Sequence, residues 1–230
     1  MQVQGPRKAK FKLKDLKSLL ISSTGVILYK HLILPIAGGF LSFAAYLRTL
    51  LPGTGYTGDT AVFQFAGKVL GITHPPGFPT YMLLNHLFSK LPIRSLAYRI
   101  NLMSALFGSL TVVLLYLIIL GLTRDRLIAF ICSLIFAFSR TFWSQSVVAE
   151  VYTLNAFFVA SVIMSLITWV EKREIKYFYL ACLTYAISFG NHLMMIALLP
   201  AFIYLIVATD YRVLLNLKNL LVTGLTQLNG

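Results

Sequence analysis

Residues 99–122 of the chain read RINLMSALFGSLTVVLLYLIILGL. After Arg99 the stretch contains no charged side chain, and its apolar residues follow one another without the alternation of a half-buried strand. The hydrocarbon core of a bilayer is about 30 Å thick, and a helix needs about 20 apolar residues to cross it. This stretch therefore predicts a helix that spans a membrane.

Further apolar runs of this kind follow one another along the sequence. Of the 230 residues, 58% are hydrophobic and 12% are charged, and the mean hydropathy is +0.79. This composition excludes an ordinary soluble domain and predicts an all-α polytopic membrane protein built as a single module, 1–230. We expect six transmembrane helices and a partial seventh, over residues 32–51, 99–122, 127–142, 151–170, 177–190, 193–209 and 213–225.

The formal net charge is +13, and the basic residues are most concentrated in residues 1–20. Basic residues beside a membrane orient the helices and attract anionic headgroups, so the expected partner is lipid and not nucleic acid. The run 32–51 lacks a small-residue cleavage pattern, which indicates a retained anchor rather than a removed signal peptide. Cys132 and Cys182 lie inside apolar runs, where a cysteine is a small hydrophobic residue.

Residues 78–91 decide the topology, because every later helix would reverse direction if they spanned the membrane. The segment is apolar but short, and it contains a proline and a lysine. Cytoplasmic loops collect Lys and Arg. If 78–91 is an interfacial or re-entrant helix, the N-terminus and the basic loops 123–126 and 171–176 all face the cytoplasm. We therefore expect 52–98 to be the first outer loop, with an interfacial helix inside it.

This topology gathers unusual polar residues on the outer side. Of the seven acidic residues, only Asp59 and Glu150 fall there. Polar groups near membrane depth are costly, so their default interpretation is functional. The other polar and aromatic candidates on this side are Tyr56, His74, Arg140, Trp143, Gln145, Tyr152, Asn191 and His192.

Several blocks of the sequence carry a family resemblance. The blocks are Tyr56-Thr57-Gly58-Asp59-Thr60, His74-Pro75-Pro76-Gly77-Phe78-Pro79, Arg99-Ile100-Asn101-Leu102, Trp143-Ser144-Gln145 and Glu150-Val151-Tyr152-Thr153-Leu154-Asn155. In this order they resemble a family of membrane proteins that was long described only as a domain of unknown function. That family includes a eukaryotic transmembrane O-mannosyltransferase acting on plexin-type receptors, and it belongs with the GT-C glycosyltransferases. Such enzymes usually carry further helices, so we interpret the chain as a module truncated at its C-terminus.

The resemblance implies an inverting glycosyltransferase that needs no cofactor. Its donor would be a hexose, by implication mannose, on a polyisoprenyl phosphate, and its acceptor a protein Ser/Thr hydroxyl or another outer-face group. The implied location is a bacterial inner membrane or the ER membrane, with a periplasmic or lumenal active side. Asp59 matches the acidic signature of the first outer loop in such enzymes, and Glu150 matches the second acidic position.

The chemistry of these residue types agrees with that implication. Transfer to a hydroxyl needs a base for its proton, and negative charge stabilises an oxocarbenium-like sugar. Asp59 and Glu150 are the catalytic candidates, and Arg140 would hold the leaving phosphate. The remaining candidates for substrate binding are Tyr56, His74, Trp143, Gln145, Tyr152 and His192.

Structural roles for the acidic residues and the histidine remain open at this point. Asp59 could cap a helix that starts near Thr60, and Glu150 could be an acid at the N-terminus of helix 151–170. His74 could belong to a rigid turn that seats the interfacial helix.

The other candidates have structural alternatives too. Trp143 and Tyr152 could be aromatic residues of the membrane interface, and Arg140 could extend its charge out of the membrane. Asn191 and His192 could form a polar helix contact. A divalent metal held by His74, Glu150 and His192 is chemically conceivable, although no close spacing supports it. At the level of function, the alternatives are a transporter or flippase of lipid-linked substrates and a non-catalytic membrane scaffold.

Overall fold

A computed structural model describes residues 33–55 and 58–213 of the chain. The basic segment 1–20, Tyr56, and all but the first residue of the expected partial helix 213–225 lie outside these ranges. Within them the chain contains helices and connecting segments but no strand, which confirms the all-α prediction.

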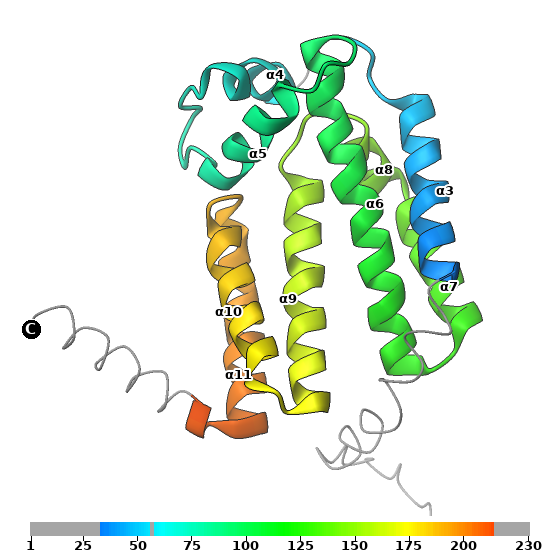
Figure 1. Ribbon diagram of the computed structural model, residues 1–230, viewed down its shortest axis with the longest axis vertical. Coiled ribbons are helices and arrows are strands. Elements are labelled where there is room, and N and C mark those ends of the chain that lie inside the picture. The colour runs from blue at the N-terminus through cyan, green and yellow to red at the C-terminus, as the bar shows by residue number, and fades with distance from the viewer. Residues whose placement is uncertain (1–32, 56–57, 214–230) are drawn as a thin grey trace, which may run out of the picture.

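Helices that run along the long axis of the molecule form its main body (Figure 1). The central pair is α6 (Leu96–Thr123) and α9 (Tyr152–Lys172), which pack against each other. On one side of this pair lie α3 (Ile33–Thr49) and α7 (Arg126–Ala137), and on the other lie α10 (Ile175–Phe189) and α11 (Leu199–Asp210). The bounds of α3, α6, α9 and α10 agree with four of the predicted runs to within a few residues.

Two of the predicted runs are not continuous α-helices. The run 127–142 divides into α7 and a short α8 (Arg140–Ser146), which is bent by 65° relative to α7. Helix α3 stabilises this break, because the Tyr46 hydroxyl donates a hydrogen bond of 2.8 Å to the carbonyl oxygen of Ala137. The run 193–209 begins as a 3-10 helix, η1 (Leu193–Leu198), before it continues as α11.

The structure contains fewer clear membrane spans than the sequence predicted. By length and composition, α6, α9 and the segment Leu193–Asp210 could cross a membrane, and α7 with α8 would be a fourth span if the bent pair is counted as one. α3 and α10 are apolar but have only 17 and 15 residues. The expected six to seven spans are therefore not confirmed in the described part of the chain.

The first loop carries two short helices at one end of the body (Figure 1). α5 (Pro79–Ser89) matches the helix expected over 78–91 and lies at the end of the bundle beside α4 (Thr60–Val69). The turns after α6 and after α9 lie together at the opposite end, as the sequence-derived topology requires.

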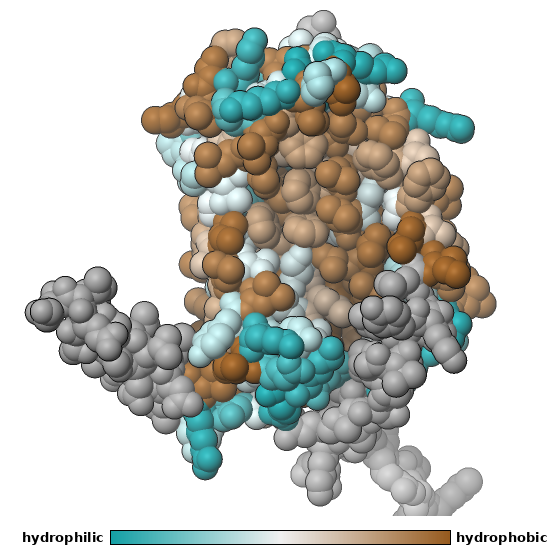
Figure 2. All heavy atoms as spheres, viewed as in Figure 1, coloured by the Kyte–Doolittle hydropathy of each residue, from teal (hydrophilic) through white to brown (hydrophobic). Residues whose placement is uncertain are grey.

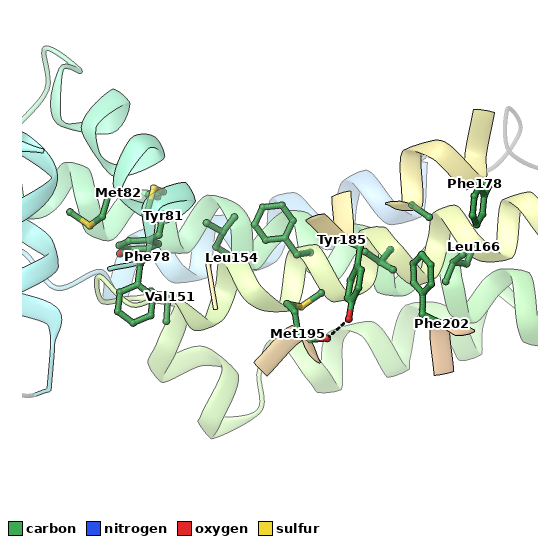
Figure 3. Packing of buried hydrophobic residues seen from close by; sticks show 14 of the residues in the cluster. Phe78, Tyr81, Met82, Val151, Leu154, Leu166, Phe178, Tyr185, Met195 and Phe202 are labelled. Carbon is green, nitrogen blue, oxygen red and sulfur yellow. Dashed lines mark hydrogen bonds between the residues drawn. The ribbon is translucent and has the colours of Figure 1, made fainter. Parts of the chain in front are cut away.

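The face shown in Figure 2 is hydrophobic along the middle of the body, and its hydrophilic side chains gather toward the two ends. The largest core cluster follows α9 from Val151, at the end near α4 and α5, to Trp169 at the opposite end. Figure 3 shows Phe78 and Tyr81 of the α5 region against Val151 and Leu154, so this core continues from the bundle into the end where α4 and α5 lie.

Candidate active site

The side chains of Asp59 and His74 contact each other at the end of the molecule where α4 and α5 lie. The Nε2 atom of His74 lies 3.5 Å from Oδ2 of Asp59, and both side chains are about half exposed. Asp59 occupies the N-cap position of α4, but its side chain makes no capping hydrogen bond. Its carboxylate therefore faces His74 and solvent, and the capping interpretation does not account for it.

Glu150 lies on the other side of this pair, in the segment that connects α8 to α9. Its Oε1 atom accepts a hydrogen bond of 3.1 Å from the Thr60 hydroxyl, one residue after Asp59. Glu150 precedes Val151, the N-cap residue of α9, and its side chain bonds across the tertiary structure to α4. The two carboxylates, which are 91 positions apart in the sequence, are thus held at the same end of α4.

The loop before α4 approaches Glu150 closely. Gly58 has a positive φ of 59°, a conformation that favours glycine. A Cβ atom at this position would lie 3.4 Å from Oε1 of Glu150. The glycine therefore lets the backbone that carries Asp59 pass next to the second carboxylate.

Burial is the main reason that the pKa of Glu150 is raised above the ordinary glutamate value. The Thr60 hydrogen bond opposes this shift, the negative charge of Asp59 adds to it, and the backbone of Asp59 and the charge of His74 oppose it. Glu150 is therefore partly withdrawn from solvent and lies within electrostatic reach of both Asp59 and His74, unlike a surface glutamate.

A row of aromatic rings extends from the Asp59–His74 pair along the same end of the molecule. The centroid of the His74 ring is 5.3 Å from that of Phe78, Phe78 is 6.1 Å from His192, and His192 is 5.9 Å from Tyr152. Burial lowers the pKa of His192, so this ring is neutral at pH 7. Three segments far apart in the sequence therefore meet beside the carboxylates, with Phe78 buried between them.

The turn before α5 holds this surface against the end of α10. The Thr80 backbone N–H donates to the carbonyl oxygen of Gly190 at 2.8 Å, and its hydroxyl donates to the carbonyl oxygen of Ile187 at 2.8 Å. A side chain at Gly190 would overlap Thr80. The buried Asn191 donates from Nδ2 to the Val151 carbonyl at 3.2 Å, next to Glu150. Asn191 thus makes the polar helix contact that was the alternative to ligand binding.

A hydrogen-bond network that the sequence did not predict lies next to Thr60 on α4. Gln64, one turn after Thr60 on α4, donates from Nε2 to Oδ1 of Asn101 at 2.8 Å and accepts from the backbone N–H of Gly55 at 3.0 Å. Asn101 in turn donates to the Leu51 carbonyl at 2.7 Å. A buried Gln and a buried Asn in apolar helices were the available signal for this network.

Arg99 has a structural role. Its Nη1 atom donates to the carbonyl oxygens of Ser89 and Leu91 at 2.6 and 2.8 Å, which fixes the end of α5 to the start of α6. The guanidinium of Arg99 is therefore used to bind backbone carbonyls, and Arg99 is not a free cation that could bind a ligand.

Tyr81 lies beneath the site and is fully buried. Its hydroxyl lies beside the Asn85 side chain without meeting hydrogen-bond geometry, and neither that hydroxyl nor Oδ1 of Asn85 has a partner among the described residues. Burial, and then the negative charge of Glu150, raise the pKa of Tyr81. The residue is thus a neutral phenol within electrostatic reach of Glu150.

The other expected site residues are divided between the two faces of α8. Trp143 turns toward α3, where its Nε1 donates to the Thr49 hydroxyl at 2.8 Å and its ring packs on Tyr46. Gln145 instead shares a surface hollow with Tyr152. Arg140 is exposed and, within the described ranges, forms neither a hydrogen bond nor an ion pair.

The structure brings Asp59, His74, Glu150, Tyr152 and His192 into one site, with Gln145 at its border, and places Trp143 elsewhere. The expected site residues do not form a metal site: in residues 33–55 and 58–213, no three His, Cys, Asp or Glu side chains are grouped so that they could bind one ion.

The fold and the site together define a helical protein with apolar, membrane-type helices and a carboxylate site at one end of the bundle. Residues 59–215 match the family described as the Protein O-mannosyl-transferase TMEM260 N-terminal domain, and the chain belongs to this family. The matched region begins at Asp59 and includes Glu150, His74 and His192.

Two curated relatives carry the same name. The chain is 35% identical over 138 residues to the Protein O-mannosyl-transferase TMEM260 of Mus musculus, a match that covers 60% of this chain and 20% of the relative. It is 26% identical over 179 residues to the Protein O-mannosyl-transferase tmem260 of Dictyostelium discoideum, which covers 70% and 22%. The chain thus spans about a fifth of the length of these relatives. No solved structure shows significant similarity to it.

Proposed function

We propose that this chain provides the donor-binding and catalytic end of a protein O-mannosyltransferase. The reaction would move mannose from a polyisoprenyl phosphate to a protein Ser/Thr hydroxyl. The observation that carries the proposal is the convergence of Asp59 and Glu150, through Thr60, at one end of an apolar helix bundle. The names of the two relatives support the reaction class.

The two carboxylates differ in environment, and this difference suggests two roles. Asp59 is half exposed and contacts His74, so an acceptor hydroxyl that arrives from water can reach it. In the proposal Asp59 accepts the acceptor's proton, and His74 orients the Asp59 carboxylate. Glu150 lies deeper, and its charge stabilises the oxocarbenium-like sugar.

The proposed orientation follows the basic loops. The turns around 123–126 and 171–176 lie at the end opposite the carboxylates and would face the cytoplasm. The α4–α5 end would then face the periplasm or the ER lumen, where α5 rests at the membrane surface. In this arrangement the chain is a multi-pass membrane protein, and its short helices α3 and α10 cross with their neighbours.

A flippase of lipid-linked sugars is the competing function, and the broken span α7–α8 is the observation that favours it, because transporters bind substrates at broken helices. In transporters such breaks occur in paired halves. The described part of the chain contains one bent pair, α7–α8, and therefore lacks the second break that such a pairing requires.

The deciding experiment reconstitutes the protein in liposomes with a mannosyl polyisoprenyl phosphate that is radiolabelled in the sugar, and supplies an acceptor peptide. Label in the peptide supports the transferase. Label that crosses the bilayer and stays on lipid supports the flippase. Label that stays in its original leaflet on lipid contradicts both and leaves a scaffold.

A further inference from the structure

The break between α7 and α8 opens a hollow on the surface of the helix bundle. α7 ends at Ala137, α8 turns away by 65°, and the space between them and the start of α9 has a volume of about 440 Å³. The hollow, called the α7–α9 groove below, is lined by Phe136, Ser139, Thr141, Phe142, Gln145 and Tyr152.

The α7–α9 groove is continuous with the candidate active site. Tyr152 lines the groove and also contacts His192, the last member of the aromatic row that starts at His74 beside Asp59. The groove therefore adjoins the site at Tyr152 and His192, whereas Phe78, which lies between His192 and His74, is buried in the core.

The lining of the groove suits an apolar chain. Phe136 and Phe142 lie on the two sides of the break with their ring centroids 4.2 Å apart, and neither belongs to the core clusters of the bundle. Both come from a helix pair that is apolar enough to count as one span, so the groove opens along a surface of membrane-type composition. Both rings are half-buried and lie outside the core, so part of each is available for contact with a ligand.

Two polar side chains accompany the lining of the groove, Gln145 on its wall and Arg140 at the start of α8. Oε1 of Gln145 is buried and has no hydrogen-bond partner in the described ranges. An unpaired buried acceptor is costly, and of the groups in the proposed donor only a sugar hydroxyl can donate to it, because isoprene units and an ionised phosphate carry no donor. Arg140 lies between two lining residues, Ser139 and Thr141, and is exposed and free to approach an anion.

We propose that the α7–α9 groove holds the first isoprene units of the lipid donor, while the phosphate lies near Tyr152 and His192 and the sugar reaches Asp59 and Glu150. This inference rests on the proposed function and names where the carrier of that reaction binds. Other hollows fit less well. The one beside Arg48 lies on the Trp143 face of α8 and shares no lining residue with the site. The one lined by Ser161 lies along α9 and α10 and shares none either.

Filling the groove tests this assignment. Thr141 is exposed on the groove wall, so Thr141→Trp places a large ring in the hollow without disturbing the core. The matched control is Ser161→Trp, which fills a hollow of about 390 Å³ away from the site. Binding of a radiolabelled long-chain polyisoprenyl phosphate is measured in nanodiscs, with thermal unfolding of each variant as the check on folding. Phe142→Ala, which removes one wall, serves if the tryptophan variant does not fold.

We expect Thr141→Trp to weaken binding of the long-chain lipid roughly tenfold, with Ser161→Trp close to the unsubstituted protein. A photoreactive group on the first isoprene units should label the peptide that contains residues 136–152. Equal affinity of the two tryptophan variants, or label on α3 or α10, would overturn the groove assignment while leaving the donor proposal in place. Absence of binding by the unsubstituted protein would instead overturn the donor proposal and the groove assignment with it.

Discussion

The hydroxyl of Thr60 donates a hydrogen bond of 3.1 Å to the Oε1 atom of Glu150, across a sequence separation of 90 residues. This contact joins α4 of the first loop to the segment before α9. Asp59 precedes Thr60, so the same bond brings the backbone of Asp59 close to the Glu150 carboxylate. The arrangement of the proposed active site therefore depends on one side-chain hydrogen bond that can be removed without a change in size.

Thr60→Val should shift the pH dependence of sugar transfer. The hydroxyl bond lowers the pKa of Glu150 against the effect of burial, so its loss raises that pKa further. If transfer needs ionised Glu150, the acidic limb of the rate profile moves to higher pH. The measurement is the rate of transfer to an acceptor peptide as a function of pH.

Thr60→Ser is the matched control, because it keeps the hydroxyl and loses only a methyl group. Its profile should overlay that of the unsubstituted protein. An unchanged profile in Thr60→Val would show that Glu150 does not ionise in the rate-limiting step.

Asp59→Asn should abolish transfer while leaving the fold intact. The Asp59 side chain makes no capping bond, so the isosteric change removes no structural contact of α4. Loss of a general base typically lowers a rate by about 10²–10⁴-fold. Transfer rate and donor affinity are measured on the same purified variant, with Glu150→Gln alongside, and donor affinity should survive. Full activity in Asp59→Asn with an inactive Glu150→Gln would reverse the two assigned roles.

Arg140→Ala should weaken binding of the lipid phosphate more than Arg140→Lys does. A guanidinium offers two parallel donors to a phosphate, whereas an ammonium offers a single charge. Donor affinity is measured for the three proteins at one salt concentration. Equal affinities would reduce Arg140 to an exposed cation that is drawn toward the membrane surface.

The orientation of the chain predicts a pattern of chemical labelling. With Cys132 and Cys182 replaced, a cysteine at exposed Pro76 should react with an impermeant reagent added outside cells, and one at exposed Asp125 should not. Labelling at position 125 from the outside would contradict the assignment of the carboxylate end to the outer side.

Gly67→Ala should destabilise the first loop. A Cβ atom at Gly67 would overlap the side chain of Asn85, whose Nδ2 atom joins α5 to the Phe63 carbonyl of α4. Overpacking of this kind costs about 1–3 kcal/mol. Gly121→Ala is the control, because its Cβ would meet nothing within 4 Å. Thermal unfolding of both variants decides the matter, and an equal midpoint for the two would mean that α4 and α5 separate freely.

The break in the run 127–142 shows where the pattern of hydrophobicity loses information. Phe138 and Ser139 interrupt the helix, yet the residues on both sides are apolar enough to predict one span. The bend is accommodated because Tyr46 of α3 satisfies the Ala137 carbonyl, and this contact lies outside any local window of sequence. Counting spans from hydropathy therefore gave a higher number than the helix lengths support.

The candidate site shows the same limit for side chains. Trp143 and Gln145 were grouped because they are adjacent in one block, but residues two apart on a helix point to different faces. Trp143 consequently packs on α3, and Gln145 borders the α7–α9 groove. The contact between Gln64 and Asn101 was not predicted, because it joins α4 to α6.

The sequence by itself determined the helical class, most helix bounds, the two candidate acids and the family blocks. These follow from local composition, since an apolar run must satisfy its own backbone bonds as a helix, and a charge near the membrane is costly wherever it lies. Only the tertiary structure decided that Asp59 pairs with His74, that Thr60 holds Glu150, and that Tyr152 joins the site to the groove. Those contacts depend on how α4, α5 and α9 pack at one end of the bundle, and packing is set by side chains far apart in the chain.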